Sequence, residues 1–420
     1  MGKGIAKILS GLLVFGMVAG LVPAVPGGTV NAKATEINGQ NATAEPHTHC
    51  VCGTGNLSVE RHTHKEETWT GISKLSDINR EGNYYLTQDV TLTSAWTCQR
   101  NVNLCLNGHS ITRTAKEYYD QNGNNAVIII KNNVDFTLTD CKGTGTITHK
   151  QGVSGEGVYN DGRFFMYNGI IFGNNGGVKN PGMFFMYGGT ITSNTANNGG
   201  GVDNAGTFTM DGGTITSNTA NNGGGVYNDN AGRFIMYGGT ITGNKAEQTY
   251  GTEYGGGVYN QGTFNMYGGE ITNNTATVGG GGVFNKGTFT MSGGEITSNS
   301  SESYGGGVCY SSSQLFKMSG TVNITENKVG TTPNNLYLWN GQQVSASGLT
   351  SGAEIGVTTQ IVPINDSSVP ITSDSVSVNC FFSDNSDYET AIDENSKVVL
   401  KTKTAVEAPS ITKQPQPVSV

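Results

Sequence analysis

The sequence predicts an all-β protein, a right-handed parallel β-helix of about nine coils with a cap at each end. The first observation is a phrase that recurs through the middle of the chain. It reads Gly-Gly-Gly-Val-Tyr-Asn and then, after a short polar gap, Gly-x-Phe-x-Met-Tyr-Gly-Gly-x-Ile-x-x-Asn. The second is that apolar and polar residues alternate within each copy, which indicates strands. The third is a charged fraction of 13%, well below the usual share of about 25%. In stacked coils a charge repeated at one position would face its own copy, which is destabilising.

The methionine of this phrase sets the period. It recurs at Met166, Met186, Met210, Met236, Met266 and Met291, with a weaker copy at Met318. The intervals are 20, 24, 26, 30, 25 and 27 residues, and a period in the twenties that tolerates insertions indicates a solenoid. A leucine-rich repeat would carry a leucine consensus that is absent here, and a propeller blade would need about 40–50 residues. The right hand is expected because parallel crossovers are almost always right-handed.

Glycine and asparagine recur at fixed places in the phrase. Triple glycines mark the expected sharp turns, where glycine reaches positive φ without a Cβ penalty, at Gly199–Gly201, Gly223–Gly225, Gly255–Gly257 and Gly305–Gly307. One asparagine column comprises Asn160, Asn180, Asn204, Asn228, Asn260 and Asn285, and a second comprises Asn174, Asn194, Asn218, Asn244, Asn274 and Asn299. Because stacked strands lie about 4.8 Å apart, we expect these amides to bond to each other and to turn backbone. A column with a member in every coil indicates a structural role rather than catalysis.

Residues 1–32 have the features of a secretory signal peptide. Lys3 and Lys7 precede the apolar run Ile8–Val22, and Val30-Asn31-Ala32 offers a small-residue cleavage site. The alternative is an uncleaved anchor, although the run is short for a membrane span. Cleavage would change the net charge from −8 to −10, because two lysines leave. An acidic chain without a basic block argues against nucleic acid and anionic membrane surfaces, and the expected location is secreted or at the cell surface.

Residues 33–68 are expected to form a polar segment that carries a histidine and cysteine cluster. The cluster comprises His47, His49, Cys50, Cys52, His62 and His64. Thiolate and imidazole are the usual zinc ligands, and two pairs about ten residues apart could close one tetrahedral site. The alternatives are a link through the cysteines and an exposed polar segment. They stay open because the Cys-x-Cys spacing is shorter than the Cys-x-x-Cys spacing of standard zinc fingers.

The β-helix with its N-terminal cap is expected over residues 69–330, with Leu106 and Leu138 anchoring the two coils before the methionines. Residues 331–404 still alternate and are expected to form a capping β region that hides the open end of the core. Residues 405–420 form a Pro-rich linker that looks like the start of an immunoglobulin-like module. Among the seven cysteines, Cys105 and Cys141 could approach one another on adjacent early coils.

On these motifs, residues 102–327 resemble right-handed parallel β-helix proteins of the pectate-lyase-like superfamily, and within it the repeat-rich surface and adhesin-like proteins of bacteria. The Gly-Gly-Gly-Val-Tyr-Asn and Ile-Thr-x-Asn phrases are similar to the paired GG[A/L/V/I] and FxxN repeats of polymorphic outer-membrane proteins. Ile stands in place of Phe in the second phrase, as in Ile215-Thr216-Ser217-Asn218. The resemblance implies a fold displayed at a cell surface and says little of activity, because one fold hosts many functions.

Enzymes that cleave polysaccharides on this fold need several carboxylates on one strand face. Glu270 and Glu295 occupy one column on neighbouring coils, and the strand spacing places them roughly 5 Å apart, close to the separation in a retaining glycosidase. Both precede isoleucine and should point to solvent, and no Arg, Lys or His lies at a matching position beside them. The pair is a catalytic or calcium-binding candidate, and its alternative is a pair of ordinary exposed acids.

Two tyrosine columns are expected to face outward. The first follows the methionines and comprises Tyr167, Tyr187, Tyr237 and Tyr267, and the second comprises Tyr159, Tyr227 and Tyr259, with Phe284. Tyrosine presents a flat apolar ring with a polar tip, which suits stacking on sugars or a protein interface. The alternative is that the rings only stabilise the sheet. Insertions at one corner, Lys245–Tyr254 and Ser300–Tyr304, add loops of the kind that often carry binding.

The sequence therefore predicts an adhesin-like surface β-helix that binds glycans or proteins of host or neighbouring cells. The alternatives are a polysaccharide-degrading lyase or glycoside hydrolase that uses the carboxylate column, and a structural stalk. No nucleic-acid partner is expected, and no membrane insertion after signal cleavage. The one cofactor expected is a structural zinc ion at the histidine and cysteine cluster.

Overall fold

The computed structural model describes residues 47–49, 67–115, 125–247, 254–377 and 379–403, all within the unit Ala44–Val420. The expected signal peptide, the expected linker and most of the histidine and cysteine cluster lie outside these residues. Regular structure in the described part consists of strands and two short 3-10 helices, η1 (Leu75–Asp77) and η2 (Trp339–Gly341). None of the described helices has the length and apolar character needed to cross a membrane.

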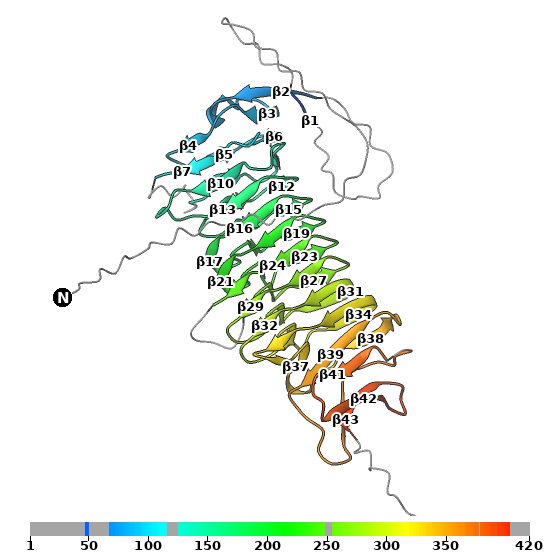
Figure 1. Cartoon of the computed structure of the whole chain (residues 1–420). Coiled ribbons are helices and arrows are strands. Elements are labelled where there is room, and N and C mark those ends of the chain that lie inside the picture. Colours follow the sequence, from blue (N-terminus) through cyan, green and yellow to red (C-terminus); the bar gives the residue numbers. More distant parts are fainter. Residues whose placement is uncertain (1–46, 50–66, 116–124, 248–253, 378, 404–420) are drawn as a thin grey trace, which may run out of the picture. The chain divides into compact units, whose positions relative to one another are not determined.

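Parallel strands stack in three columns, so the predicted parallel β-helix is confirmed. The chain passes through the Val column, the Met column and the Ile column in turn, each named after its repeated inward residue. Figure 1 shows the succession in the Met column, where β15, β19, β23 and β27 follow one another from rung to rung.

The Met column contains β2 (Glu67–Ile72), β3 (Gly82–Leu86), β6 (Val102–Cys105), β9 (Asp135–Thr139), β12 (Arg163–Met166), β15 (Met183–Met186), β19 (Thr207–Met210), β23 (Arg233–Met236), β27 (Thr263–Met266), the first halves of β31 (Thr288–Thr297) and β34 (Phe316–Thr325), and β38 (Ser345–Leu349). The Ile column contains β4 (Val90–Leu92), β7 (Ile111–Arg113), β10 (Thr146–His149), β13 (Ile170–Phe172), β16 (Thr190–Thr192), β20 (Thr214–Thr216), β24 (Thr240–Thr242), β28 (Glu270–Thr272), the second halves of β31 and β34, and the start of β39 (Glu354–Thr359). The Val column contains β5 (Trp96–Cys98), β8 (Ile128–Ile130), β11 (Val158–Asn160), β14 (Val178–Asn180), β18 (Val202–Asn204), β22 (Val226–Asn228), β26 (Val258–Asn260), β30 (Val283–Asn285), β33 (Val308–Tyr310), β37 (Leu336–Leu338) and the end of β39.

Besides the three columns, a separate and smaller sheet lies at the corner between the Ile and Val columns. It contains β17 (Thr195–Asn198), β21 (Thr219–Asn222), β25 (Lys245–Ala246), β29 (Thr275–Ala276), β32 (Ser300–Ser301), β35 (Lys328–Val329) and β36 (Thr332–Pro333), the last of them antiparallel. The strands shorten from four residues to two where the expected corner insertions enter. This corner sheet forms one wall of the cleft described below.

The ends of the stack are closed by other pairings. β1 (His47–His49) pairs antiparallel with β2, and β41 (Phe381–Ser383) adds a parallel strand beside β39. An antiparallel sheet of β40 (Ser368–Pro370), β43 (Val398–Thr402) and β42 (Tyr388–Ile392) follows. Val369, Val398 and Leu400 of this sheet belong to the same buried cluster as the coils, so it packs against the end of the core.

The Met position holds one buried residue per rung over nine rungs, in pairwise register from Leu104 through Leu138 to Met318. The expectation for Leu138 is confirmed, since it pairs with Met166. The expectation for Leu106 is wrong, because β6 ends at Cys105 and Leu104 is the residue that pairs with Leu138. Leu106 is buried as well, which is why the alternation alone did not separate the two.

Phenylalanine rings run along the core beside the methionines. Consecutive rings from Phe164 to Phe316 stack with centroids 4.5–4.8 Å apart, so each buried ring packs on its own copy in the next coil. Burial of large apolar side chains contributes about 1.5–3 kcal/mol each, and the stack repeats that contribution once per rung.

Both asparagine columns are buried ladders, as predicted. In the Val column each Nδ2 donates to the Oδ1 of the next asparagine from Asn160 to Asn285, at 2.6–2.8 Å. The second ladder lies where the Ile column ends, and there the backbone N of each residue also donates to the next Oδ1. Each Nδ2 in this ladder also donates to an isoleucine carbonyl of the preceding coil. The ladder asparagines are buried, and their amides are paired as a buried position requires, except for Oδ1 of Asn160 at the start of the first ladder.

The second ladder extends beyond the expected six residues and has a different group at each end. It continues through Asn327 and Asn335 to Asp384, whose carboxylate accepts from the backbone N and Nδ2 of Asn335 at 2.8 and 2.6 Å. At the other end, Nδ1 of His149 lies 2.9 Å from Oδ1 of Asn174. Each asparagine of this ladder also donates to the group on its Asp384 side, so the last of these hydrogen bonds end on a charged carboxylate, which strengthens them.

The glycine triplets have two separate causes. The first glycine of three of the four triplets has positive φ, as expected for Gly199, Gly223 and Gly305. The later glycines are needed for space, because a Cβ on Gly224 would lie 2.5 Å from a carbonyl oxygen of the corner sheet and 2.6 Å from one of the next coil. Glycine therefore lets the coils approach closely as well as turn.

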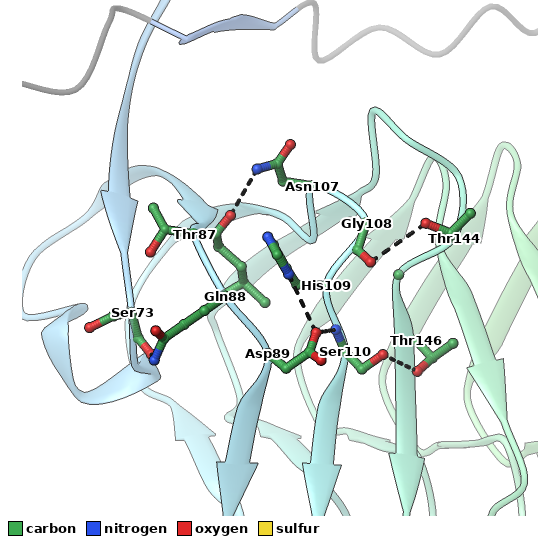
Figure 2. A network of polar contacts seen from close by, with 12 residues as sticks. Ser73, Thr87, Gln88, Asp89, Asn107, Gly108, His109, Ser110, Thr144 and Thr146 are labelled. Carbon is green, nitrogen blue, oxygen red and sulfur yellow. Dashed lines mark hydrogen bonds and ion pairs between the residues drawn. The ribbon is translucent and has the colours of Figure 1, made fainter. Parts of the chain in front are cut away.

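Polar side chains join the turns of the first coils (Figure 2). Asp89 accepts from the backbone N of Ser110 at 2.9 Å and lies 3.4 Å from the His109 ring. Thr146 donates to the Ser110 hydroxyl at 2.8 Å, which carries the contact into the following coil. These early coils lack the asparagine repeats, and irregular contacts of this kind take their place.

Candidate functional site

The tyrosines that follow the methionines form an outward column on the turn after the Met column. We call the six residues Tyr167, Tyr187, Asp211, Tyr237, Tyr267 and Ser292 the tyrosine column. Backbone bonds from Tyr187, Asp211, Tyr237 and Tyr267 to the methionine carbonyl of the preceding coil fix the order. The expectation that this position faces outward is met by Tyr237 and Tyr267, which keep 54% and 45% of their surface exposed.

The rings of this column stack in two separate pairs. Tyr167 and Tyr187 have centroids 4.9 Å apart at 18°, and Tyr237 and Tyr267 have centroids 5.1 Å apart at 14°. Asp211 separates the pairs and Ser292 follows the second pair, so a small polar residue adjoins both outer ring faces of Tyr237 and Tyr267. A flat apolar face beside a hydrogen-bonding group is the arrangement that sugar rings and interface side chains use.

Asp211 is half-buried between the two ring pairs. Burial raises the pKa of its carboxyl above the ordinary value, and burial followed by the charge of Asp211 raises the pKa of the Tyr187 hydroxyl. The carboxylate can accept hydrogen bonds from ligand hydroxyls, while the ring faces on either side offer apolar contact.

The second column, on the outward side of the Val strands, does not behave as expected along its whole length. Tyr159 and Tyr227 are half-buried, but Tyr259 is only 3% exposed, so the expectation that its ring is available for binding is wrong. Tyr259 and Phe284 belong to a separate apolar cluster outside the core, against which Tyr304 and Trp339 pack. The corner insertion and the C-terminal coil therefore cover this face, and Tyr227 is also occupied, donating its hydroxyl to Gln261 at 2.7 Å.

The same face is open in the earlier coils, where it forms a polar cleft of about 640 Å³. The cleft is lined by Glu156, by Lys179 and Asp203 of the Val column, and by residues of β17 and β21. Lys179 and Asp203 are register partners on adjacent rungs. Asn197 and Asn198 also line the cleft, and their Oδ1 atoms accept from Nδ2 of Asn221 and Asn222 at 3.4 and 3.0 Å.

Asp203 has the most perturbed carboxyl of this cleft. Burial raises its pKa to about 6, partly opposed by the positive charge of Lys179 and supported by the negative charges of Asp229 and Glu156. A carboxyl with this pKa can hold or release a proton near neutral pH, which is the property that a general acid or base needs.

The predicted carboxylate pair is present as a pair but stands in open surroundings. Glu270 and Glu295 are direct register partners, and both side chains are exposed. Their other neighbours in the column are Thr240 and Asn323, so no cation lies at the adjoining register positions. Neither residue lines the polar cleft.

The predicted zinc cluster falls largely outside the described residues. Cys50, Cys52, His62 and His64 are among those not described, and of His47 and His49 only the backbone is described, as strand β1. The zinc site therefore stays a prediction. Within the described part of the chain, one other group of metal-ligating side chains lies close together, namely Cys105, Asp140 and Cys141.

Asp203, Lys179 and Asp211 were not identified as site residues from the sequence. Lys179 and Asp203 interrupt the column that contains Tyr159 and Tyr227, and Asp211 interrupts the tyrosine column. A break in an outward column was therefore the available signal. Comparisons with protein-family models, with curated proteins and with solved structures find no match.

Proposed function

We propose that this protein is a secreted, surface-associated β-helix that binds glycans along the tyrosine column. The observation that carries the proposal is the exposed Tyr237–Tyr267 pair with Asp211 at one end and Ser292 at the other. A pyranose ring would pack its C–H face on an outer tyrosine face and donate hydroxyl hydrogens to Asp211. The next ring pair, Tyr167–Tyr187, repeats the arrangement on the other side of Asp211, which suits a ligand of several sugar units.

The wider context supports an adhesin-like role. The repeats resemble those of polymorphic outer-membrane proteins and of pectate-lyase-like β-helices, and the first 32 residues have the pattern of a signal peptide. A stack of coils with a low charged fraction presents regular outward columns, on which a few substitutions create a binding surface. The expected ligand source is the surface of a host or neighbouring cell.

A glycan array with the full chain tests this function. We expect Tyr237→Ser/Tyr267→Ser to lose at least about tenfold in apparent affinity, because both apolar ring faces are removed. Asp211→Asn should weaken binding less, since the amide keeps one acceptor oxygen. Phe172→Ser is the matched control, because Phe172 is 46% exposed on the Ile column, away from the tyrosine column. No bound glycan, or equal binding by wild type and double variant, would contradict the proposal and favour a stalk.

A second function, polysaccharide cleavage, is favoured by one specific observation, the raised pKa of Asp203 in a cleft that also holds Glu156 and Lys179. In such a reaction Asp203 would hold the transferable proton and Lys179 would stabilise developing negative charge. Incubation with pectins, mucins and host glycans, followed by product detection, tests it. Turnover lost in Asp203→Asn and kept in Glu270→Gln would assign the cleft, whereas the reverse would assign the Glu270–Glu295 pair.

A further inference from the structure

Two cysteine side chains meet between consecutive early coils. Cys105 is the last residue of β6, and Cys141 comes two residues after the end of β9, the strand that pairs with β6. Their sulfur atoms and a carboxylate oxygen of Asp140 all lie within 4.8 Å of one another. The two thiols also contact each other through a side-chain hydrogen bond.

The turn that carries Cys105 is held firmly around this pair. The backbone N of Asn107 donates to the Cys105 sulfur at 3.3 Å, and the Cys141 thiol donates to Oδ1 of Asn107 at 3.4 Å. Nδ2 of Asn107 donates to the Leu86 carbonyl at 3.0 Å, which ties the same turn to the preceding coil. The two sulfur atoms are therefore held near each other by fixed backbone.

Asp140 does not need an ion to account for its position. Its carboxylate accepts from the backbone N of Gly108 at 2.7 Å, of Gly145 at 2.6 Å and of Lys142 at 3.2 Å. Three backbone donors satisfy a buried carboxylate and explain why it lies in this turn. These donors leave the close approach of the two thiols unexplained. Because Asp140 is already satisfied, a covalent link between the thiols is favoured over a metal site.

We propose that Cys105 and Cys141 are a modification site, at which a small disulfide oxidant converts the two thiols into a disulfide that joins consecutive coils. One oxidant molecule is consumed, and both of its halves leave as thiols. The two protein thiols give up two protons and two electrons, the oxidant takes up both as its S–S bond breaks, and one S–S bond forms between the coils.

The order of the two exchange steps follows from exposure. Cys141 is exposed, so its thiolate attacks the oxidant first and forms a mixed disulfide. Cys105 is fully buried, and burial raises the pKa of its thiol to about 12. Its thiolate then attacks the Cys141 sulfur and expels the second half of the oxidant. Because that thiolate is scarce at neutral pH, ring closure should accelerate about tenfold per pH unit between pH 7 and 9.

The link would act on the end of the solenoid that lacks the asparagine ladders. Terminal coils have a neighbour on one side only, so they open before the central coils do. A disulfide between residues 105 and 141 closes the chain that connects two of these coils. We expect the oxidised protein to have a Tm higher by on the order of 5 °C than the reduced protein.

Peptide mapping of the folded full-length protein tests the proposal. The reduced protein is treated with oxidised glutathione, its remaining thiols are alkylated, and it is digested with trypsin, which places Cys105 in peptide 101–113 and Cys141 in peptide 132–142. We expect one linked product, two hydrogen atoms lighter than the sum of these peptides. In the Cys105→Ser variant, the reaction should stop at the mixed disulfide of Cys141 with glutathione. The Cys380→Ser variant, which changes another buried cysteine, should still give the linked product.

Three outcomes would overturn the proposal. One is alkylation of both cysteines after oxidation of the folded wild type, and another is linkage of either one to a different cysteine. The third is one zinc ion retained per chain and lost in both Cys141→Ser and Asp140→Asn, which would assign a metal site instead. Mapping is done on the wild type, so a variant that fails to fold leaves the result intact.

Discussion

The inward and outward side chains of the same strands follow different rules. In β23, Phe234 and Met236 point inward and have the same residue types above and below them. Directly after the methionines of the Met column, the tyrosine column changes from Asp211 to Tyr237 in one step along the stack. It then changes from Tyr267 to Ser292 two coils later. The inward columns therefore repeat where packing demands it, and the outward columns are free to differ.

The difference separates structural repetition from candidate function. An inward residue packs on the equivalent residue of both neighbouring coils, so a substitution there changes the packing in both of them. An outward residue that is not covered by another part of the chain has solvent on one side, so a change there alters the surface without disturbing the stack. Breaks in outward columns, at Asp203 and Asp211, coincide with the two candidate sites. The following predictions test how far this separation holds.

The largest difference in the free energy of unfolding is expected between alanine variants of two aromatic residues that are only three positions apart. The Phe234 ring is buried between Phe208 and Phe264, with centroids 4.8 and 4.6 Å away. Phe234→Ala should lower the free energy of unfolding by about 3–5 kcal/mol, because it leaves a cavity in the ring stack. Tyr237→Ala should lower it by less than about 1 kcal/mol. Urea unfolding followed by circular dichroism measures both, and equal losses would show that the outward rings are structural.

A second comparison uses asparagines in a buried and an exposed ladder. Asn244 Oδ1 accepts from the backbone N and Nδ2 of Asn218, both at 3.0 Å, and its Nδ2 donates to Ile215 and Asn274. Asn244→Ala should lower the free energy of unfolding by about 2–4 kcal/mol, because it leaves buried donors and an acceptor without partners. The exposed pair Asn221 and Asn197, 3.4 Å apart, provides the control.

Asn221→Ala should change the free energy of unfolding by less than about 0.5 kcal/mol, since water replaces the lost bond. Amide hydrogen exchange in the coils next to residue 244 locates the loss in the first variant. If the two variants were equally stable, the buried ladder would be contributing no more than the exposed one.

The sequence predicted the inward columns well because each one appears many times. Val, Phe, Met, Ile and Asn recur at fixed offsets, and the period is visible without any knowledge of the turns. The first coils lack that repetition, and there Leu104 and Leu106 both fit the alternation. Only the end of β6 and the turn at Asn107, with φ of 50°, decide between them.

The outward faces were less predictable, because what covers them comes from elsewhere in the chain. Alternation correctly directed Tyr259 away from the core, but Tyr304 and Trp339, from later coils, pack over its cluster. The polar cleft was missed for a related reason. Its carboxylates Glu156 and Asp203 lie on different coils, and Glu156 stands before the start of β11, where the alternation within a strand does not assign a face.

A third prediction concerns pH and the open half of the Val column face. The pKa of Asp203 is raised to about 6 in the folded protein, so the folded state holds a proton that the unfolded state releases near pH 4. The associated stability is present below about pH 4 and is lost as the pH rises to about 6. Asp203→Asn should therefore be more stable than wild type by about 1–3 kcal/mol at pH 7 and not at pH 4.

Thermal unfolding of both proteins between pH 4 and pH 8 measures this gain. Asp161→Asn, which changes an exposed carboxylate two coils earlier, is the matched control. A gain for Asp203→Asn that is the same at every pH would mean that packing, and not proton binding, sets the difference. The result also tests the property on which the cleavage hypothesis depends.

The smallest effect on the free energy of unfolding is expected from a substitution in the exposed carboxylate pair. Glu270 and Glu295 face each other directly in register, and like charges in that relation repel. Glu295→Gln should raise the free energy of unfolding by a few tenths of a kilocalorie per mole at low salt, and salt should abolish the gain by screening. Glu354→Gln is the control, because Glu354 is exposed in the same column but pairs with Asn323.

A gain at Glu295 but not at Glu354, measured by urea unfolding at low and high salt, would mean that the pair is an electrostatic liability of the stack. An outward column tolerates such a pair because solvent weakens the repulsion, whereas an inward column would not. If Glu295→Gln were instead clearly destabilising at every salt concentration, the two carboxylates would be holding something in common, such as a calcium ion. The pair would then belong with the interrupted columns as a site, and regularity alone would no longer identify the structural positions.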